Sequence, residues 1–594
     1  MTAAGSNGQT RQDDQVRRDG QVRWNDPVRR AGIAVVTGAL ALSLIPSGAI
    51  AAESSTPPAM PGIGTGSDSQ GGGPGGAQGG GPGGMPGRGA DTMAFDYSGS
   101  YSGVLAADGE SVSSDDESIS ATEADQNAAL AQNGGTLTIT NGSLDKSGDD
   151  TNGDNCNFYG LNSILLGVGT NSQANVSSTS LSASSEGSNA IFATDGATVY
   201  ANNDTITTSA GNSRGLDATY GGTIVANEMD ISTRGDHSAS VATDRGGGDI
   251  SLTNSTLQTA GLGSPLLYST GDIEVSNVTG TATGSQIAGM EGLNTILVND
   301  STLESTITGK TASDPIADGI IIYQSTSGDA EPTTGESATF QAADSTLKSA
   351  ITSGSMFYLT NTSADIVLSD TTLDFDSSAA NLLQAEGNDS NGWGTAGSNG
   401  ATVTLTGISQ TLRGTISADT ISSVTAYLTE GTTWTGAATI TQNASATTTT
   451  DAPISVNIDA TSKWAVSADS TVSNLTVAEG GQVVDSGGSA VTVMDASGNT
   501  LVKGTSDVTV TVEGSYSTSY DASGAGSLAT EAGDRSDFDG QYGTDTSFSM
   551  GDDSGQASSS EAGSNATSDS SDSAQGSSWW DGIVSFFKGL LGIG

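Results

Sequence analysis

Residues 199–206 read VYANNDTI, and this stretch decides the fold. Apolar residues alternate with polar ones over its first half, Asn203 stands at the centre, and Thr205-Ile206 restores the alternation. A period of two is typical of a short strand with one face turned inward, and Asn suits the tight turn between two such strands. The stretch therefore predicts two short strands joined by a sharp bend.

The same unit recurs as apolar-x-apolar-x-(Asn/Asp/Ser)-x-(Thr/Ser)-(Leu/Ile). Further copies lie at residues 137–144, 174–181, 250–257, 296–303, 340–347 and 366–373, with looser ones from Ile224 and Ile273. From residue 174 to residue 296, successive copies begin 23 to 26 residues apart, which is the length of one β-helix coil. A solenoid also suits a chain that is only 5% aromatic, because each coil needs few inward aliphatic side chains. We therefore predict an all-β fold, a right-handed parallel β-helix (solenoid).

Segments of different composition flank the patterned part, which we place at residues 93–512. Residues 1–51 have a long polar and basic start, an apolar run and an Ala-x-Ala ending, which predict a signal peptide cleaved between Ala51 and Ala52. Residues 52–92 are rich in Gly and Pro, and residues 513–578 are rich in Ser, Gly and Asp. Both are expected to be disordered spacers.

Residues 579–594 form a short apolar, amphipathic segment that contains Trp579, Trp580, Phe586 and Phe587. It is too short to span a bilayer, but it could lie in a membrane interface. We expect it to retain the protein at the cell surface through membrane or cell-wall contact. The alternative is a tail that folds back on the solenoid.

Three departures from the repeat are expected within the β-helix. Residues 95–133 are predicted to be an N-terminal cap with a helix-like run at 123–132. Longer gaps between repeats predict protruding loops at residues 314–337 and 387–400. Beyond residue 402 the rhythm lengthens, with Trp434 and Trp464 standing 30 residues apart, and we interpret these as Trp-marked coils that close the solenoid near Val512.

The charge of the chain limits its partners. The formal net charge is −49, with 67 Asp and Glu against 18 Lys and Arg, so a nucleic acid is not expected, since phosphate binding needs clustered cations. Divalent cations would be attracted, and residues 148–154 could offer Ca²⁺ oxygen ligands, although they lack the full EF-hand spacing. No other cofactor is expected. Cys156 is the single cysteine, so no intramolecular disulfide forms, and it suits a buried position.

Charged and aromatic residues gather in the middle of the repeats. Counted back from the following coil, four residues share nearly one register and two carboxylates flank them: Tyr220, Arg245, Tyr268 and Glu291, with Asp217 and Asp244. Coils of a parallel stack lie about 5 Å apart, so these residues should form one column. Rings and charges in a column are typical of a sugar-binding groove. The alternative is an internal ladder in which carboxylates satisfy Arg245.

The sequence offers less for catalysis. Asp217 and Asp244 could form the carboxylate pair of a glycoside hydrolase. His237 is the only histidine, is expected at a turn, and has no partners at the spacing of a zinc site or a Ser-His-Asp triad.

Several of these segments resemble adhesin-like right-handed β-helix proteins exported by gut Gram-positive bacteria. The resemblance covers roughly residues 92–380 and rests on residues 124–130, 158–162, 187–194, 214–222, 242–248 and 264–271. The Trp-marked coils are similar to the C-terminal coils of autotransporter passengers. The resemblance implies adhesion and, with the spacer-rich ends, a Gram-positive surface; it offers no catalytic residues to carry over. The Gly-His-Gly and Arg-x-Lys motifs of pectinase-type β-helix enzymes are absent from the sequence.

These observations favour a secreted or surface-bound adhesin-like protein that binds host or microbial glycans or proteins along one solenoid face. One alternative is a polysaccharide lyase or hydrolase that uses Asp217, Asp244 and Arg245. A second is a structural component of a surface layer with no ligand.

Overall fold

The computed structural model describes residues 94–325, 330, 337–529 and 533–551. Four sequence predictions concern residues outside these ranges: the signal peptide with its cleavage between Ala51 and Ala52, the spacer at 52–92, the second half of the acidic spacer, and the apolar segment with Trp579, Trp580, Phe586 and Phe587. Among the described residues, no helix is both long enough and apolar enough to cross a membrane.

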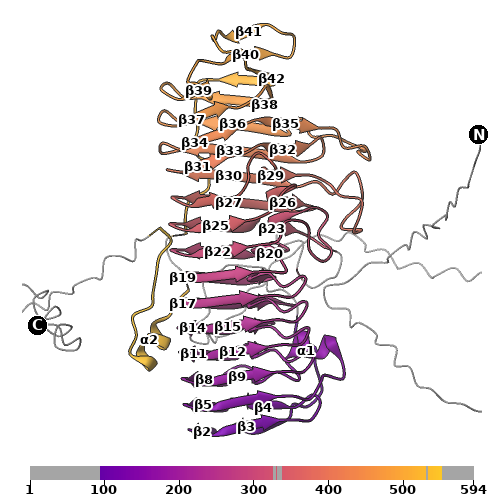
Figure 1. Ribbon diagram of the computed structural model, residues 1–594, viewed down its shortest axis with the longest axis vertical. Coiled ribbons are helices and arrows are strands. Elements are labelled where there is room, and N and C mark those ends of the chain that lie inside the picture. The colour runs from indigo at the N-terminus through magenta and orange to yellow at the C-terminus, as the bar shows by residue number, and fades with distance from the viewer. Residues whose placement is uncertain (1–93, 326–329, 331–336, 530–532, 552–594) are drawn as a thin grey trace, which may run out of the picture. The chain divides into compact units, whose positions relative to one another are not determined.

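Each of the N-terminal coils contributes one strand to a sheet A and two short strands, or one long strand, to a sheet B. In one coil, β10 (Ile191–Thr194) belongs to sheet A, and β11 (Thr198–Asn202) and β12 (Thr205–Thr208) belong to sheet B. Each strand pairs in parallel with its counterpart one coil along, as Val199 does with Ile224. The coils stack from β1 at one end to β41 at the other (Figure 1). The predicted all-β fold, a parallel β-helix, is therefore confirmed.

Within the described residues, sheet A has 13 strands and sheet B has 25. Sheet A consists of β1 (Gly103–Asp108), β4 (Asn127–Gln132), β7 (Leu165–Val168), β10, β13 (Leu216–Ala218), β16 (Val241–Thr243), β18 (Leu267–Ser269), β20 (Ala288–Glu291), β23 (Asp318–Tyr323), β26 (Ser355–Thr360), β29 (Asn381–Ala385), β32 (Ile416–Asp419) and β35 (Ala438–Thr441). Sheet B begins with β2 (Ser111–Asp115), β3 (Ser118–Ala121), β5 (Thr136–Thr140), β6 (Ser143–Lys146), β8 (Gln173–Ser177), β9 (Ser180–Ala183), β11, β12, β14 (Gly222–Asn227), β15 (Asp230–Thr233), β17 (Gly248–Thr259) and β19 (Asp272–Ala282). It continues through β21 (Thr295–Asn299), β22 (Thr302–Ser305), β24 (Ala338–Ala343), β25 (Thr346–Ser349), β27 (Ser363–Ser369), β28 (Thr372–Asp374), β30 (Thr402–Ile408), β33 (Ser423–Thr429), β36 (Ile454–Ile458), β38 (Ser470–Val477), β40 (Thr492–Asp495), β41 (Thr500–Val502) and β42 (Thr509–Ser517).

The bend between the two sheet B strands has the predicted backbone. Asn203 has φ 59°, and the corresponding Asn254 and Asn277 have φ 52° and 54°. The left-handed region costs most residues free energy, and Asn tolerates it best after Gly. Asn277 Nδ2 also donates to Asn254 Oδ1 at 2.7 Å, so these side chains form a ladder along the stack.

A third sheet, C, runs through the C-terminal coils. It contains β31 (Thr411–Arg413), β34 (Thr433–Gly436), β37 (Lys463–Val466) and β39 (Gln482–Asp485). Trp434 and Trp464 point inward from it and stack with ring centroids 4.6 Å apart and an interplanar angle of 9°. Each indole Nε1 donates to a backbone carbonyl, that of Gly414 or Gly436. The predicted Trp-marked coils are confirmed as coils of the same solenoid.

The N-terminal cap prediction is wrong. Residues 103–121 already form the first coil, β1 to β3, and of the helix-like run expected at 123–132, residues 127–132 are strand β4. Its Ala-rich sequence favours a helix, but β4 pairs on one side with β1 and on the other with β7. Pairing on both edges outweighs this intrinsic preference. The described helix near this end is α1 (Gly153–Tyr159), which is inserted before β7.

The described parts of the two loops predicted to protrude are packed in part on the solenoid. Residues 318–323 are strand β23 of sheet A. In the 387–400 segment, Trp393 is 7% exposed and stacks on Tyr323 of β23, with centroids 4.3 Å apart. Asn391 Nδ2 donates to the Ser313 carbonyl at 2.6 Å. The outer face of sheet A therefore gives this loop an apolar surface to pack on.

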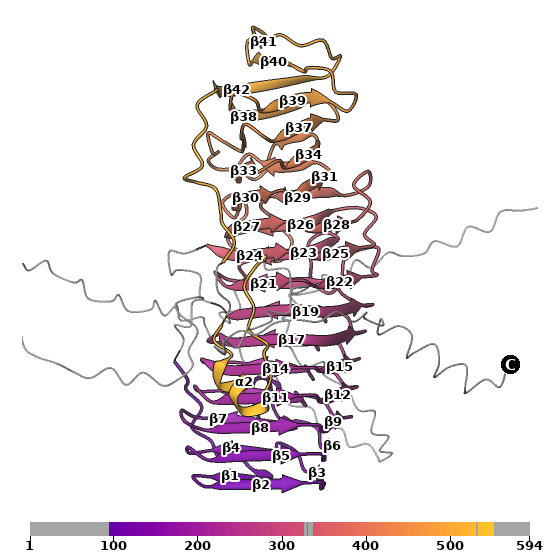
Figure 2. The same ribbon diagram turned by 90° about the vertical axis from the view of Figure 1, so that its left-hand side faces the viewer.

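The acidic spacer prediction is wrong for residues 513–529 and 533–551. After β42 the chain turns back along the outer face of sheet B and forms α2 (Ser536–Tyr542), as Figure 2 shows in yellow. We call the described residues 518–551 the strap. Gly526 N donates to Thr406 Oγ1 at 2.8 Å, and Ala529 N donates to Gln341 Oε1 at 2.7 Å. A Cβ on Gly526 would lie 2.7 Å from Val367 Cγ2, so part of the glycine content serves close packing rather than flexibility.

Candidate functional site

The residues predicted to form one column lie on sheet A or in the turns that follow its strands, and they do not share one register. Asp217 pairs with Ala242, Ala242 pairs with Tyr268, and Tyr268 pairs with Gly289, so Glu291 lies two residues beyond the row of Tyr268. Tyr220 and Arg245 are neighbours, since Tyr220 N donates to the Arg245 carbonyl. The count failed because the turns from sheet A to sheet B differ in length: residues 219–221, 244–247 and 270–271 in successive coils.

Asp217 and Asp244 share one buried cation, Arg214. Its Nη1 lies 3.1 Å from Asp217 Oδ2 and its Nη2 lies 2.7 Å from Asp244 Oδ2. Nη1 also donates to Oδ1 of Asn157, a residue of α1. All three charged side chains are buried, and burial raises the pKa of Asp217 well above its ordinary value while Arg214 opposes that rise. This is the internal ion-pair alternative, with Arg214 in the place expected for Arg245.

Arg245 and Tyr220 contact the aromatic residues around α1. The Arg245 guanidinium carbon lies 3.7 Å from the centre of the Phe158 ring. Tyr220 stacks on Tyr159, with centroids 5.6 Å apart and an angle of 4°, and Phe95 meets Tyr220 edge-on. The Tyr220 ring is therefore occupied by protein neighbours.

Tyr268 and Glu291 belong to a second buried network. Glu291 Oε2 accepts from Tyr268 Oη at 3.0 Å and from Tyr323 Oη at 3.3 Å, and Ser325 Oγ donates to Oε1. Tyr268 is 6% exposed and Glu291 is 2% exposed. Of the six candidates only Arg245 is partly exposed, so this set offers no ligand an open face.

Three smaller predictions can be compared with the same region. His237 lies in a turn with φ 54°, and Cys156 is buried as a free thiol, as the sequence indicated. In the parts of the chain that the structure describes, no group of three or more His, Cys, Asp or Glu side chains is arranged to hold a metal ion. At residues 148–154, Asp149 accepts from Glu186 N, and Asp150 contacts the Cys156 thiol.

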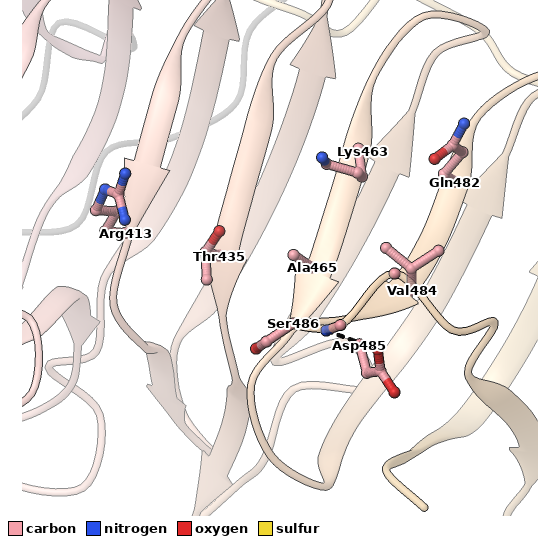
Figure 3. Close-up of a pocket in the computed structure, with 10 residues that line it drawn as sticks. Arg413, Thr435, Lys463, Ala465, Gln482, Val484, Asp485 and Ser486 are labelled. Atoms are coloured by element: carbon pink, nitrogen blue, oxygen red, sulfur yellow. Dashed lines mark hydrogen bonds between the residues drawn. The ribbon is translucent and has the colours of Figure 1, made fainter. Parts of the chain in front are cut away.

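An open concave surface lies instead on the outer face of sheet C. Its volume is about 490 Å³, and its lining residues come from β31, β34, β37, β39 and the turn that follows β39. They are Arg413, Thr435, Lys463, Ala465, Gln482, Val484, Asp485, Ser486, Gly487 and Gly488 (Figure 3). We call this surface the sheet C groove.

Alternation along the strands places the groove residues in two rows. Arg413, Thr435, Ala465 and Val484 are paired across the sheet, and so are Thr411, Thr433, Lys463 and Gln482. The residues between the rows point inward and include the stacked Trp434 and Trp464. A rigid, densely packed layer thus lies directly beneath the groove.

A tight turn forms one wall of the groove. Asp485 Oδ1 accepts from Gly487 N and from Ser489 N, each at 2.8 Å. Hydrogen bonds from Ser506, Ser489 and Gly487 lower the pKa of Asp485. The carboxylate is therefore ionised near neutral pH and is used to hold its own turn.

Sequence reasoning missed Arg413, Lys463 and Gln482. The signal was present: Arg413 follows inward Leu412, and Lys463 precedes inward Trp464, so both had to face outward in a region where cations are sparse. The sequence pattern was interpreted from the inward Trp residues alone, and the outward residues beside them were not considered as a binding surface.

Comparison with family models and with curated proteins gave no match. Among solved structures, the chain is similar to one in the cryo-EM structure of the Vag8–C1 inhibitor complex, with 13% identity and a TM-score of 0.39, over 70% of this chain and 100% of that one. It is also similar to a tailspike protein of E. coli bacteriophage HK620 in complex with a pentasaccharide, with 9% identity and a TM-score of 0.34, over 67% of this chain and 72% of that one. The fold assignment itself rests on the strand pairing of this chain.

Proposed function

We propose that this protein is an extracellular, adhesin-like β-helix of a Gram-positive surface that binds a glycan in the sheet C groove. The observation that carries the proposal is the groove itself: an open surface lined mainly by polar side chains on a rigid sheet. The sequence pattern of a signal peptide at residues 1–51 supports the extracellular location.

The chemistry of the lining favours a glycan over a protein partner. Thr435, Gln482 and Lys463 offer donors and acceptors for hydroxyl groups, and Ala465 and Val484 offer small apolar patches. Rows repeated about every 5 Å also suit a linear polymer of similar units.

The enzyme alternative finds less support in the described residues. A glycoside hydrolase needs two carboxyl groups facing its substrate, and Asp485 is the one carboxylate in the lining of this groove. Asp217 and Asp244 are buried on Arg214, away from solvent. A structural surface-layer role would need no ligand and is the outcome if no glycan binds.

A glycan array with the full secreted chain tests the proposal. We expect binding that Thr435→Val with Gln482→Ala weakens at least tenfold. The matched control is Thr256→Val with Gln258→Ala, an exposed Thr/Gln pair on β17 far along the stack, and it should bind as the wild type does. Absence of any glycan binding, or equal loss in both variants, would contradict the proposal.

A further inference from the structure

We infer that the ligand of the sheet C groove is an acidic polysaccharide, whose anionic groups are bound by Arg413 and Lys463. This inference rests on the proposed function, because it names the class of glycan that the same groove takes. It adds the charge of the glycan, which the uncharged residues of the groove and the fold do not specify.

The first observation is a local reversal of charge. The whole chain has 67 acidic residues and 18 Lys and Arg. Yet the outward strand positions of sheet C are Thr411, Arg413, Thr433, Thr435, Lys463, Ala465, Gln482 and Val484, which include two cations and no carboxylate. In so acidic a protein, an outward face of average composition would have a negative net charge, whereas this face has a positive one.

The second observation is that both cations remain available. In the described part of the chain, neither Arg413 nor Lys463 takes part in an ion pair, whereas Arg214 pairs with two carboxylates and Lys348 pairs with Glu304. Arg413 is exposed and Lys463 is partly exposed. No carboxylate among the described residues therefore competes with a ligand for either charge.

The third observation is their spacing. Arg413 is on β31 and Lys463 is on β37, two coils along the stack, which puts their strands about 10 Å apart. Thr435 of β34 and Ala465 of β37 continue the row of Arg413 with short side chains, so the floor beside Lys463 is open. In Figure 3 the two cationic side chains stand on the same side of the sheet. Anionic groups that recur along a linear polymer could meet both.

The one carboxylate in the groove does not cancel them. Asp485 lies on β39, the groove strand farthest from Arg413, and its Oδ1 is held by Gly487 N and Ser489 N. Arg presents a planar fork that pairs with carboxylate or sulfate through two hydrogen bonds, and Lys adds a point charge. The net charge of −49 repels an acidic polymer from the rest of the surface, so binding is confined to this face.

The test uses the full secreted chain with three probes: a uronate-containing oligosaccharide, the same oligosaccharide after its carboxyl groups are reduced to alcohols, and a sulfated oligosaccharide. The variant is Arg413→Gln with Lys463→Gln. The control, Lys310→Gln with Lys503→Gln, makes the same change in net charge at exposed positions outside the groove. The intact fold is checked by the near-UV circular dichroism of the buried Trp434–Trp464 pair.

We expect the wild type to bind the uronate probe at least tenfold more tightly than its reduced form, and the groove variant to lose that difference while the control keeps it. A higher affinity for the sulfated probe than for the uronate, lost in the same variant, would also support the inference and identify sulfate as the anion. Equal binding of the uronate and its reduced form would overturn the acidic class and leave the proposed function standing. Loss of acidic binding in the control would overturn the inference as well. Failure of every glycan to bind would refute the proposed function itself.

Discussion

Arg535 should hold the strap to the solenoid. Its side chain is 1% exposed and makes five hydrogen bonds. Nη1 donates to the backbone and side-chain oxygens of Ser251 at 2.9 and 2.7 Å, and Nη2 to the Ala226 carbonyl and Thr253 Oγ1. Nε bonds Thr546 Oγ1 within the strap. One side chain thus joins the strap to β14 and β17.

The substitution Arg535→Ala should destabilise docking of the strap by about 3–5 kcal/mol, because several buried acceptors lose a charged donor and each one left unsatisfied costs about 1–3 kcal/mol. The carbonyls of Ala226 and Ser251 lose this donor, and the Arg side chain no longer fills its site. Because the coils pair with one another rather than through the strap, the loss should be local. A free energy of 3–5 kcal/mol corresponds to roughly 160- to 5,000-fold faster exchange of the backbone amides that open with the strap.

Hydrogen exchange followed by mass spectrometry measures this directly on peptides from residues 518–551 and from β14 and β17. Arg413→Ala, at an exposed arginine, is the matched control and should leave exchange in the strap unchanged. Unchanged exchange of the strap in Arg535→Ala would refute the reasoning. Faster exchange throughout the coils would show instead that the strap is part of one cooperative unit with them.

Three further predictions concern the solenoid. Trp464→Ala should lower the free energy of unfolding by about 3–5 kcal/mol, because it leaves a cavity beside Trp434 and an unpaired Gly436 carbonyl. The measurement is the thermal midpoint, and a midpoint equal to that of the wild type would show that the Trp stack does not stabilise the fold. Asn203→Val should cost about 1–2 kcal/mol, since a β-branched residue at φ 59° is strained, whereas Thr207→Val in the same coil should be near neutral; equal thermal midpoints for the two variants would contradict this. Burial raises the pKa of Asp314 to about 8, so the folded state binds the extra proton and stability should fall as pH rises from about 4 to 8. The thermal midpoint should therefore be higher at pH 5 than at pH 8.5, and the difference should shrink in Asp314→Asn. A midpoint that does not change with pH would contradict this prediction.

Local alternation and turn chemistry were sufficient to predict the solenoid. The unit VYANNDTI gives two strands and a bend at Asn203, and repetition at coil length makes a parallel stack the arrangement in which every inward face is covered. Trp434 and Trp464 likewise stand at equivalent inward positions of successive coils. Each of these features depends on residues close together in the sequence.

What the sequence did not reveal depends on contacts between distant residues. The strap looks like a polar spacer until Arg535 meets Ser251, 284 residues away. The column at Tyr220 and Tyr268 failed because turn lengths vary from coil to coil, so register cannot be counted across them. Burial of Asp217 depends on α1, whose Asn157 also binds Arg214, and no local pattern shows that a helix inserted two coils earlier covers this surface.

The course of the strap also determines which part of the molecule a mechanical force on the chain reaches first. Phe95, near the first described residue, packs on Tyr220, and Gly551, the last, donates to Asn299 Oδ1 of β21. The backbone thus enters and leaves the stack at its flank, many coils from either pole, as the yellow segment in Figure 2 shows for the C-terminal side. Tension from the C-terminal side would reach the strap and the sheet B face first, and tension from the N-terminal side would first reach the contact of Phe95 with the aromatic residues around α1. The solenoid would then be loaded near the middle of its stack. The coils that carry the sheet C groove do not lie between the two points of loading.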